Sequence, residues 1–271
     1  MTRTLSALQA DWDAWHSTRE AQLQTPHGWL SLTALHWLTP EPTVIEGLPG
    51  RWSATPRGVT IAATAADGLV VDADGAGDAD GEPIDGSVTL RPVDGMPGSL
   101  VAAGERVVEI ARRTDSHVLR VRDPQAPTRT AFTGVPAFPV DERWVLDARF
   151  EPYPEPRPIT VDAVVAGLNH FPTALGVVRF AVDGEDHRLV ALAGRTGGLS
   201  LHFRDATSGE TTYPGGRLVQ VEDPAPDGSV TVDLNRLVNL PCAFTEFATC
   251  PLPPAGNVLA VAVEAGERDP A

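Results

Sequence analysis

The sequence predicts a mainly β protein, an antiparallel barrel or sandwich-like sheet with one N-terminal helix packed on it and a proline-rich, irregular C-terminal segment. Three observations predict this class. One long helical pattern occupies residues 5–24. From about residue 40 the chain becomes a series of short alternating segments, interrupted by many of the 25 glycines and 25 prolines. The short spacing of these segments is typical of antiparallel sheets.

The helix is predicted over "LSALQADWDAWHSTREAQLQ", residues 5–24. Its apolar residues recur at helical spacing on one face, and they are Leu5, Leu8, Trp12, Trp15 and Leu23. The following "PHGWLSLTALHWL" is apolar throughout, so we expect a buried connector, either a short helix or a strand. Residues 1–39 would form this helix and connector, and residues 40–271 the antiparallel β domain, in one compact unit.

Strands are predicted where apolar residues alternate between turn signals. These segments are residues 117–122, 143–150, 159–165, 177–182, 187–192, 199–203, 217–221, 229–234 and 258–265. Asp183-Gly184 between two of them is a hairpin signal. The acidic, glycine-rich residues 72–86 depart from the EF-hand pattern at its glycine and its final glutamate, so a solvated turn is expected there.

Composition excludes several function classes. The chain has 36 acidic and 21 basic residues, a net charge of -15, which repels a nucleic-acid backbone. It contains no lysine, which excludes Schiff-base lysines, lysine-anchored pyridoxal phosphate and a Walker A site. Any cation that binds a substrate must therefore be an arginine. No signal peptide or membrane-spanning run is visible, so a cytoplasmic protein without membrane or nucleic-acid partners is expected.

Common catalytic and metal motifs are missing from the chain. There is no Gly-x-Ser-x-Gly, His-Glu-x-x-His or Cys-x-x-Cys, and the seven histidines form no closely spaced pairs. We therefore expect neither an organic cofactor nor a metal, while a metal site assembled from distant strands stays open.

Both cysteines lie in "PCAFTEFATCPLPP", residues 241–254. The favoured interpretation is core packing of Cys242 and Cys250, with Asn235 and Asn239 bonding the backbone of an irregular segment. Two alternatives remain: a pocket wall that presents either cysteine as a nucleophile, and a reversible disulfide.

A second glycine-rich segment is "FRDATSGETTYPGGR", residues 203–217. It is interpreted as a long hairpin connection, in which Asp205 caps the turn and Arg204 or Arg217 makes an ion pair. The alternative is a pocket rim where Tyr213 and Arg217 bind a substrate anion. His27, in "TPHGWL", would bond the backbone at the end of the helix, or act as a general base if it lines the same pocket.

Four stretches carry a resemblance. They are "HGWLSLTALHWL", "RVRDPQAPTRTAFTGVPAFPVD", "FRDATSGETTYPGGR" and "TVDLNRLVNLPCAFTEFATCPLPPAGNVLAVAVEAGER". These stretches occur in the same order as in the domain of unknown function 1684 family, which the chain resembles. It departs from the family pattern at Leu234 and Leu240. The resemblance implies a cytoplasmic, mostly β bacterial protein, and it assigns no reaction.

The leading hypothesis is a cofactor-independent enzyme, a hydrolase or a lyase/isomerase, that acts on an anionic small molecule. The candidate catalytic residues are His27, Asp233, Cys242 and Cys250, and the candidate substrate-binding residues are Arg204, Tyr213, Arg217, Asn235, Asn239 and Trp29. The alternatives are a non-catalytic binder of small ligands and a protein-interaction scaffold. The oligomeric state is left open.

Overall fold

The computed structural model describes residues 5–72, 81 and 83–270. Contacts divide the chain into two compact units: one joins the segment up to Glu20 with residues from Thr133 onward, and the other is Ala21–Phe132. The sequence, in contrast, predicts one compact unit with an internal boundary after residue 39. In the described part of the chain, no helix has the length and apolar character needed to cross a bilayer.

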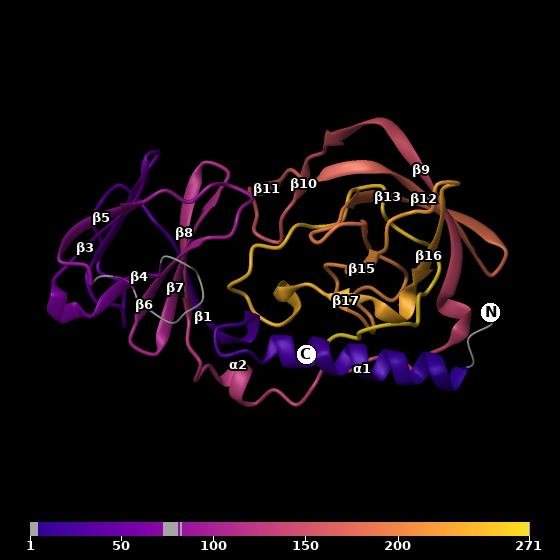
Figure 1. The fold of residues 1–271 in the computed structure, drawn as a ribbon, viewed down its shortest axis with the longest axis horizontal. Coiled ribbons are helices and arrows are strands. Elements are labelled where there is room, and N and C mark those ends of the chain that lie inside the picture. Colours follow the sequence, from indigo (N-terminus) through magenta and orange to yellow (C-terminus); the bar gives the residue numbers. More distant parts are fainter. Residues whose placement is uncertain (1–4, 73–80, 82, 271) are drawn as a thin grey trace. The chain divides into compact units, whose positions relative to one another are not determined.

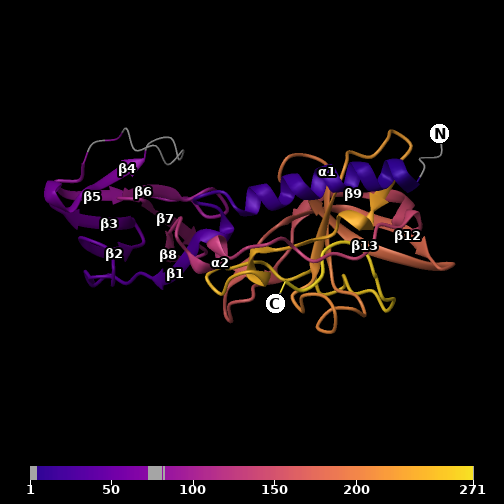
Figure 2. The same cartoon turned by 90° about the horizontal axis from the view of Figure 1, so that it is seen from below.

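The unit from Thr133 onward is built on one seven-stranded antiparallel sheet that curves into a half-barrel (Figures 1 and 2). Its strand order is β16-β9-β12-β13-β14-β15-β17, and β10 and β11 form a separate pair. The elements are η3 (Glu142–Trp144), β9 (Val145–Pro158), β10 (Val161–Asp162), β11 (Asn169–His170), β12 (Thr173–Val182), β13 (Glu185–Ala193), β14 (Leu199–Phe203), β15 (Arg217–Val221), β16 (Ser229–Asp233), η4 (Leu234–Arg236), β17 (Val238–Asn239) and η5 (Pro241–Ala243).

The unit Ala21–Phe132 contains two smaller antiparallel sheets. One has the order β1-β8-β7-β6-β4 and the other β2-β3-β5. The elements are η1 (Trp29–Ser31), β1 (Leu32–Trp37), β2 (Arg51–Thr55), β3 (Gly58–Ala63), η2 (Ala65–Asp67), β4 (Leu69–Asp72), β5 (Gly86–Leu90), β6 (Ser99–Ala103), β7 (Arg106–Arg113), β8 (Ser116–Arg122) and α2 (Pro127–Thr130). A core that includes Trp52, Ile61 and Leu119 holds this unit together.

The predicted N-terminal helix is confirmed as α1, Leu5–Leu23. Up to Glu20 it runs along the half-barrel, and both views show this (Figures 1 and 2). Leu8 is buried, and the Trp12 indole donates a 2.6 Å hydrogen bond to the Asn235 carbonyl. The helix is therefore fixed to the half-barrel unit by apolar packing and by bonds to the chain around η4.

Most predicted strands are confirmed, and residues 199–203 and 217–221 match β14 and β15 residue for residue. The hairpin between β12 and β13 turns at Asp183 and Gly184, with φ of 50° and 83°. Positive φ at both central residues is typical of a type I′ turn, whose twist matches the right-handed twist of the flanking strands. The predicted strand at 143–150 begins later, because Asp141 accepts a bond from the Arg143 amide and starts a 3-10 turn. The predicted 159–165 strand shrinks to Val161–Asp162.

The strand predicted at residues 258–265 is wrong. This segment is irregular, yet Leu259, Val263 and Ala265 are buried in the core of the half-barrel. The backbone carbonyls of Val263 and Ala265 accept bonds from the Arg217 side chain, as described below. A side chain thus takes acceptors that a neighbouring strand would otherwise occupy. The acidic residues 72–86 fall largely outside the described residues.

Asn257 ties this C-terminal segment to the sheet. Its side chain is fully buried, accepts from the Val190 amide at 2.8 Å, and donates to the Val190 and His202 carbonyls at 3.0 Å each. We expect Asn257→Ala to lower the free energy of unfolding by more than about 2 kcal/mol, because it leaves buried backbone groups unpaired. Urea unfolding monitored by tryptophan fluorescence measures this change.

The matched control is Val258→Ala in the neighbouring, 60% exposed residue. It should stay within about 0.5 kcal/mol of the wild type. Equal effects of the two substitutions would contradict the proposed anchoring role of Asn257.

Candidate functional site

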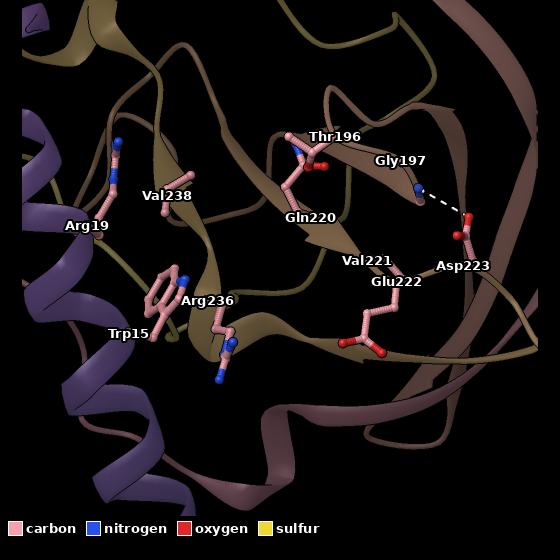
Figure 3. Close-up of a pocket in the computed structure, with 11 residues that line it drawn as sticks. Trp15, Arg19, Thr196, Gly197, Gln220, Val221, Glu222, Asp223, Arg236 and Val238 are labelled. Carbon is pink, nitrogen blue, oxygen red and sulfur yellow. Dashed lines mark hydrogen bonds between the residues drawn. The ribbon is translucent and has the colours of Figure 1, made fainter.

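A cavity of about 710 Å³ opens within the half-barrel unit (Figure 3). Its walls are Trp15 and Arg19 from α1, residues 196–198 before β14, residues 220–223 at the end of β15, and Arg236 and Val238 near β17. Figure 3 shows the residues of α1 and those near β17 on one side, and residues 220–223 on the other. The cavity therefore has two walls built from distant parts of the chain.

Arg236 forms the centre of the basic wall. Its guanidinium carbon lies 5.4 Å from the centre of the Trp15 ring, within the range of a cation–π contact. It bonds the Asp11 carboxylate and forms a 3.5 Å ion pair with Asp233. These three neighbours hold the guanidinium at the cavity, and Asp233 serves to position it.

Arg19 is the second cation of this wall. Its Nε donates to the Glu267 carboxylate at 3.2 Å and its Nη2 to the Asn239 carbonyl at 2.9 Å. Trp15 and Arg19 are four residues apart, so they project from the same face of α1. Docking of the helix therefore delivers an aromatic ring and a cation to the cavity together.

The opposite wall is acidic. Glu222 and Asp223 follow β15 and are exposed, and Asp223 accepts a 3.2 Å bond from the Gly198 amide. Gly198 has φ of +65°, and a Cβ there would lie 2.2 Å from the Val221 carbonyl oxygen. Only glycine allows so close an approach. In Figure 3 the Glu222 carboxylate points toward the side where Trp15 and Arg236 lie.

The two walls of the cavity carry opposite charges. Two guanidinium groups face two carboxylates, so the formal charges of the lining sum to zero. Each guanidinium has five N–H donors, which leaves several beyond those used above. The lining contains no cysteine or histidine. Across the described residues, no group of three or more His, Cys, Asp or Glu side chains is placed to hold a metal ion.

Arg217, a predicted anion-binding residue, is fully buried away from this cavity. Its Nη2 donates to Asp205 at 3.0 Å and to the Val263 carbonyl at 2.8 Å, and its Nη1 donates to the carbonyls of Ala265 and Glu267. Burial lowers the pKa of Arg217, while the Asp205 carboxylate raises it. The ion pair that the sequence offered as one interpretation of residues 203–217 is thus confirmed.

Asp205 also caps the turn as predicted. One of its oxygens accepts from the Thr207 amide at 2.8 Å, from the Thr207 hydroxyl at 2.6 Å and from the Val263 amide at 3.2 Å. Both Nη groups of Arg217 and both oxygens of Asp205 thus have polar partners, while the buried Arg217 Nε has none among the described residues. Such compensation is what makes a buried ion pair tolerable.

Asn235 and Asn239 bond the backbone, as the sequence predicts. Asn235 exchanges two 3.0 Å hydrogen bonds with the backbone of Asp141. The Asn239 side chain donates to the Arg268 carbonyl at 2.7 Å. Both residues are buried, so their roles are to pair backbone groups of the irregular segments.

Tyr213, Cys242 and Cys250 form a separate cluster. The Cys242 amide donates to the Cys250 sulfur at 3.3 Å, and neither cysteine is in a disulfide. A hydrogen bond with Cys250 lowers the pKa of the Cys242 thiol, burial opposes this, and a hydrogen bond with Tyr213 lowers it further. Burial raises the pKa of Tyr213, and the bond to Cys242 adds to this.

Three other candidates occupy different surroundings. The backbone of Arg204 pairs with the C-terminal segment, accepting from the Leu259 amide at 2.9 Å. In the unit Ala21–Phe132, His27 Nε2 lies 2.9 Å from the carbonyl oxygen of Glu105, so His27 bonds the backbone between β6 and β7 and not the end of the helix. In that unit Trp29 lies below the guanidinium of Arg122, 5.1 Å away. A pocket shared by His27 and Tyr213 stays a prediction.

The residues that line the cavity are not among the candidate site residues that the sequence predicts. The sequence places Trp15 among the apolar residues of one helix face, and Arg19 sits in an ordinary charged stretch of the helix. The available signals were their spacing of four residues and the acidic pair Glu222-Asp223 directly after a predicted strand. Neither signal indicates that the two places meet.

His202 was also missed, and it is 2% exposed on β14. Its Nε2 has no hydrogen-bond partner within the described ranges. Burial lowers the pKa of His202 to about 4, a bond to the Gly215 backbone opposes this, and the charge of Arg204 adds to the lowering. The folded protein therefore keeps this imidazole neutral.

This burial gives stability a defined pH dependence. Between pH 6.5 and about 4 the unfolded chain binds a proton at His202 that the folded protein excludes, so stability falls as pH falls through this window. We expect His202 to cost about 2 kcal/mol of unfolding free energy at pH 5 relative to pH 7.5. Urea unfolding at both pH values should show this loss partly removed in His202→Gln.

The control for His202→Gln is a destabilised variant that retains His202. Val232→Ala, in the fully buried core of β16, should lower stability at both pH values while retaining the wild-type difference between them. An unchanged pH difference in His202→Gln would show that His202 is not the titrating group.

The family model described as a protein of unknown function (DUF1684) matches residues 130–268. The solution NMR structure of an uncharacterized protein from Haloarcula marismortui is 31% identical, covers 52% of this chain and 78% of that chain, and superposes with a TM-score of 0.44. No curated protein matches the chain. Since the matched region spans half of its length, the chain belongs to the DUF1684 family.

Proposed function

We propose that this protein binds a small zwitterionic molecule with an apolar or aromatic portion, in the cavity between α1 and the end of β15. The observation that carries the proposal is the pairing of walls: Arg236 and Trp15 on one side, and Glu222 and Asp223 on the other. A ligand with both charges matches both walls, whereas a simple anion would meet the carboxylates as well.

The donors available at the basic wall support a carboxylate partner. Arg236 uses Nη2 for Asp11 and Nε for Asp233, so Nη1 remains for a ligand oxygen. Planar guanidinium groups suit carboxylates because two N–H groups can bond two oxygens. The Trp15 ring beside it offers an apolar surface to the rest of the ligand.

The acidic wall suits an ammonium group. Glu222 is exposed and has no ion pair within the described residues, and Asp223 makes one bond to the backbone. A volume of about 710 Å³ is ample for a ligand of amino-acid size.

Catalysis by the residues selected from the sequence stays a prediction. Neither Tyr213 nor Arg217 lines this cavity, and Arg217 gives its donors to Asp205 and to backbone carbonyls. A hydrolase or a lyase/isomerase at this cavity would need another proton-transferring group, and the carboxylates of Glu222 and Asp223 are the candidates in its lining.

The test uses three related compounds in isothermal titration calorimetry: phenylalanine, its amide without the carboxylate, and its N-acetyl form without the ammonium group. We expect phenylalanine to bind, and each truncated compound to bind at least about tenfold more weakly, since each loses one charged contact. Arg236→Gln should weaken phenylalanine but leave the amide unchanged. Glu222→Gln should weaken phenylalanine but leave the N-acetyl form unchanged.

The control is Arg179→Gln, a half-exposed arginine paired with Glu151 at 2.9 Å and outside the cavity. It should bind like the wild type. Absence of binding by phenylalanine and by a wider set of zwitterions, or equal loss in all three variants, would contradict the proposal.

A further inference from the structure

We propose that Cys242 and Cys250 form a peroxide-oxidisable dithiol, in which Cys242 is oxidised first and Cys250 then closes an intrachain disulfide. These are the two cysteines of the chain, and the folded protein brings them together across the segment that follows β17. The site is distinct from the cavity, whose lining contains neither residue.

Proximity is the first argument. The Cys250 sulfur lies 3.3 Å from the Cys242 amide nitrogen. The amide nitrogen is about 1.46 Å from its own Cα, so the Cys250 sulfur lies within about 4.8 Å of the Cys242 Cα. The Cys242 side chain also hydrogen-bonds the Cys250 side chain. Formation of a bond between the sulfurs therefore needs a rotation of side chains and little movement of the backbone.

The different burial of the thiols assigns their order. Cys250 is 7% exposed, whereas Cys242 is partly exposed and open to a small oxidant. Attack on peroxide requires the thiolate, and reactive cysteines are those with access and a stabilised thiolate. Both features belong to Cys242, because Tyr213 and Cys250 each hydrogen-bond its side chain.

The chemistry balances with hydrogen peroxide as the oxidant. The Cys242 thiolate attacks one peroxide oxygen, the O–O bond breaks, and the departing hydroxide takes a proton to become water, leaving a sulfenic acid. The Cys250 thiol then attacks the sulfenic sulfur. The S–S bond forms, the S–O bond breaks, and a second water leaves with the Cys250 proton. Two thiols are oxidised and one peroxide is reduced to two waters.

The experiment treats the reduced full chain with hydrogen peroxide, blocks remaining thiols with a maleimide, and measures intact mass. The expected product is a monomer about 2 Da lighter that takes no maleimide and returns to the dithiol with a reductant. In Cys250→Ser the reaction should stop at a sulfenic acid on Cys242, trapped by dimedone. In Cys242→Ser the remaining Cys250 should stay a thiol over the same period.

Tyr213→Phe separates a positioning role from packing. It removes the hydroxyl that bonds Cys242 but keeps the ring beside Gly215. The pH at which oxidation reaches half its maximal rate should rise, while the final disulfide is unchanged. A purely structural role for Tyr213 would leave this pH profile as in the wild type.

Three results overturn the proposal. They are wild-type thiols that still take two maleimides after peroxide, oxidation of wild type to sulfinic or sulfonic acid without a disulfide, and oxidation of Cys250 in Cys242→Ser as fast as Cys242 in Cys250→Ser. Thermal unfolding of each variant checks that it is folded, and the wild-type result tests the proposal without any substitution.

Discussion

The buried ion pair between Arg217 and Asp205 is the interaction on which the half-barrel unit depends. A charge in an apolar core is costly unless an opposite charge and hydrogen bonds compensate it. Here the guanidinium holds one carboxylate and three carbonyls of the irregular C-terminal segment, and the carboxylate closes the turn that follows β14. One side chain therefore joins a strand, a turn and the segment that fills the concave face of the sheet.

This constraint reaches the cavity through β15. Arg217 is the first residue of that strand, and Glu222 follows its last residue, so anchoring one end fixes the direction of the acidic wall. Glu267 belongs to the same network, since its carbonyl accepts from Arg217 and its carboxylate accepts from Arg19. Burial raises the pKa of Glu267, and the charge of Arg19 opposes this. The basic wall is thus linked to the core by a few polar side chains.

The local sequence pattern predicts the helices and strands of this fold better than it predicts which of them come into contact. The helix Leu5–Leu23 and strands such as β14 and β15 were predicted because periodicity and turn residues lie within the elements themselves. Residues 258–265 alternate like a strand, yet their partners come from the Arg217 side chain, which no alternation records. The cavity joins α1 to residues more than 170 positions away. The sequence shows the charged residues of both walls, but it does not show that the two walls face each other. Proximity of the two cysteines was one of several open interpretations for the same reason.

The discontinuous composition of the half-barrel unit has a consequence for biosynthesis. The unit needs α1 from the beginning of the chain and the carbonyls of residues 263–267 from near its end. Residues 21–132 are contiguous and have their own core, so a ribosome completes that unit while most of the other unit is still untranslated. Once Asp205 and Arg217 have been synthesised, they still lack the carbonyls of residues 263–267 until translation reaches that segment. The half-barrel unit therefore acquires its native core only after translation has reached the C-terminal segment.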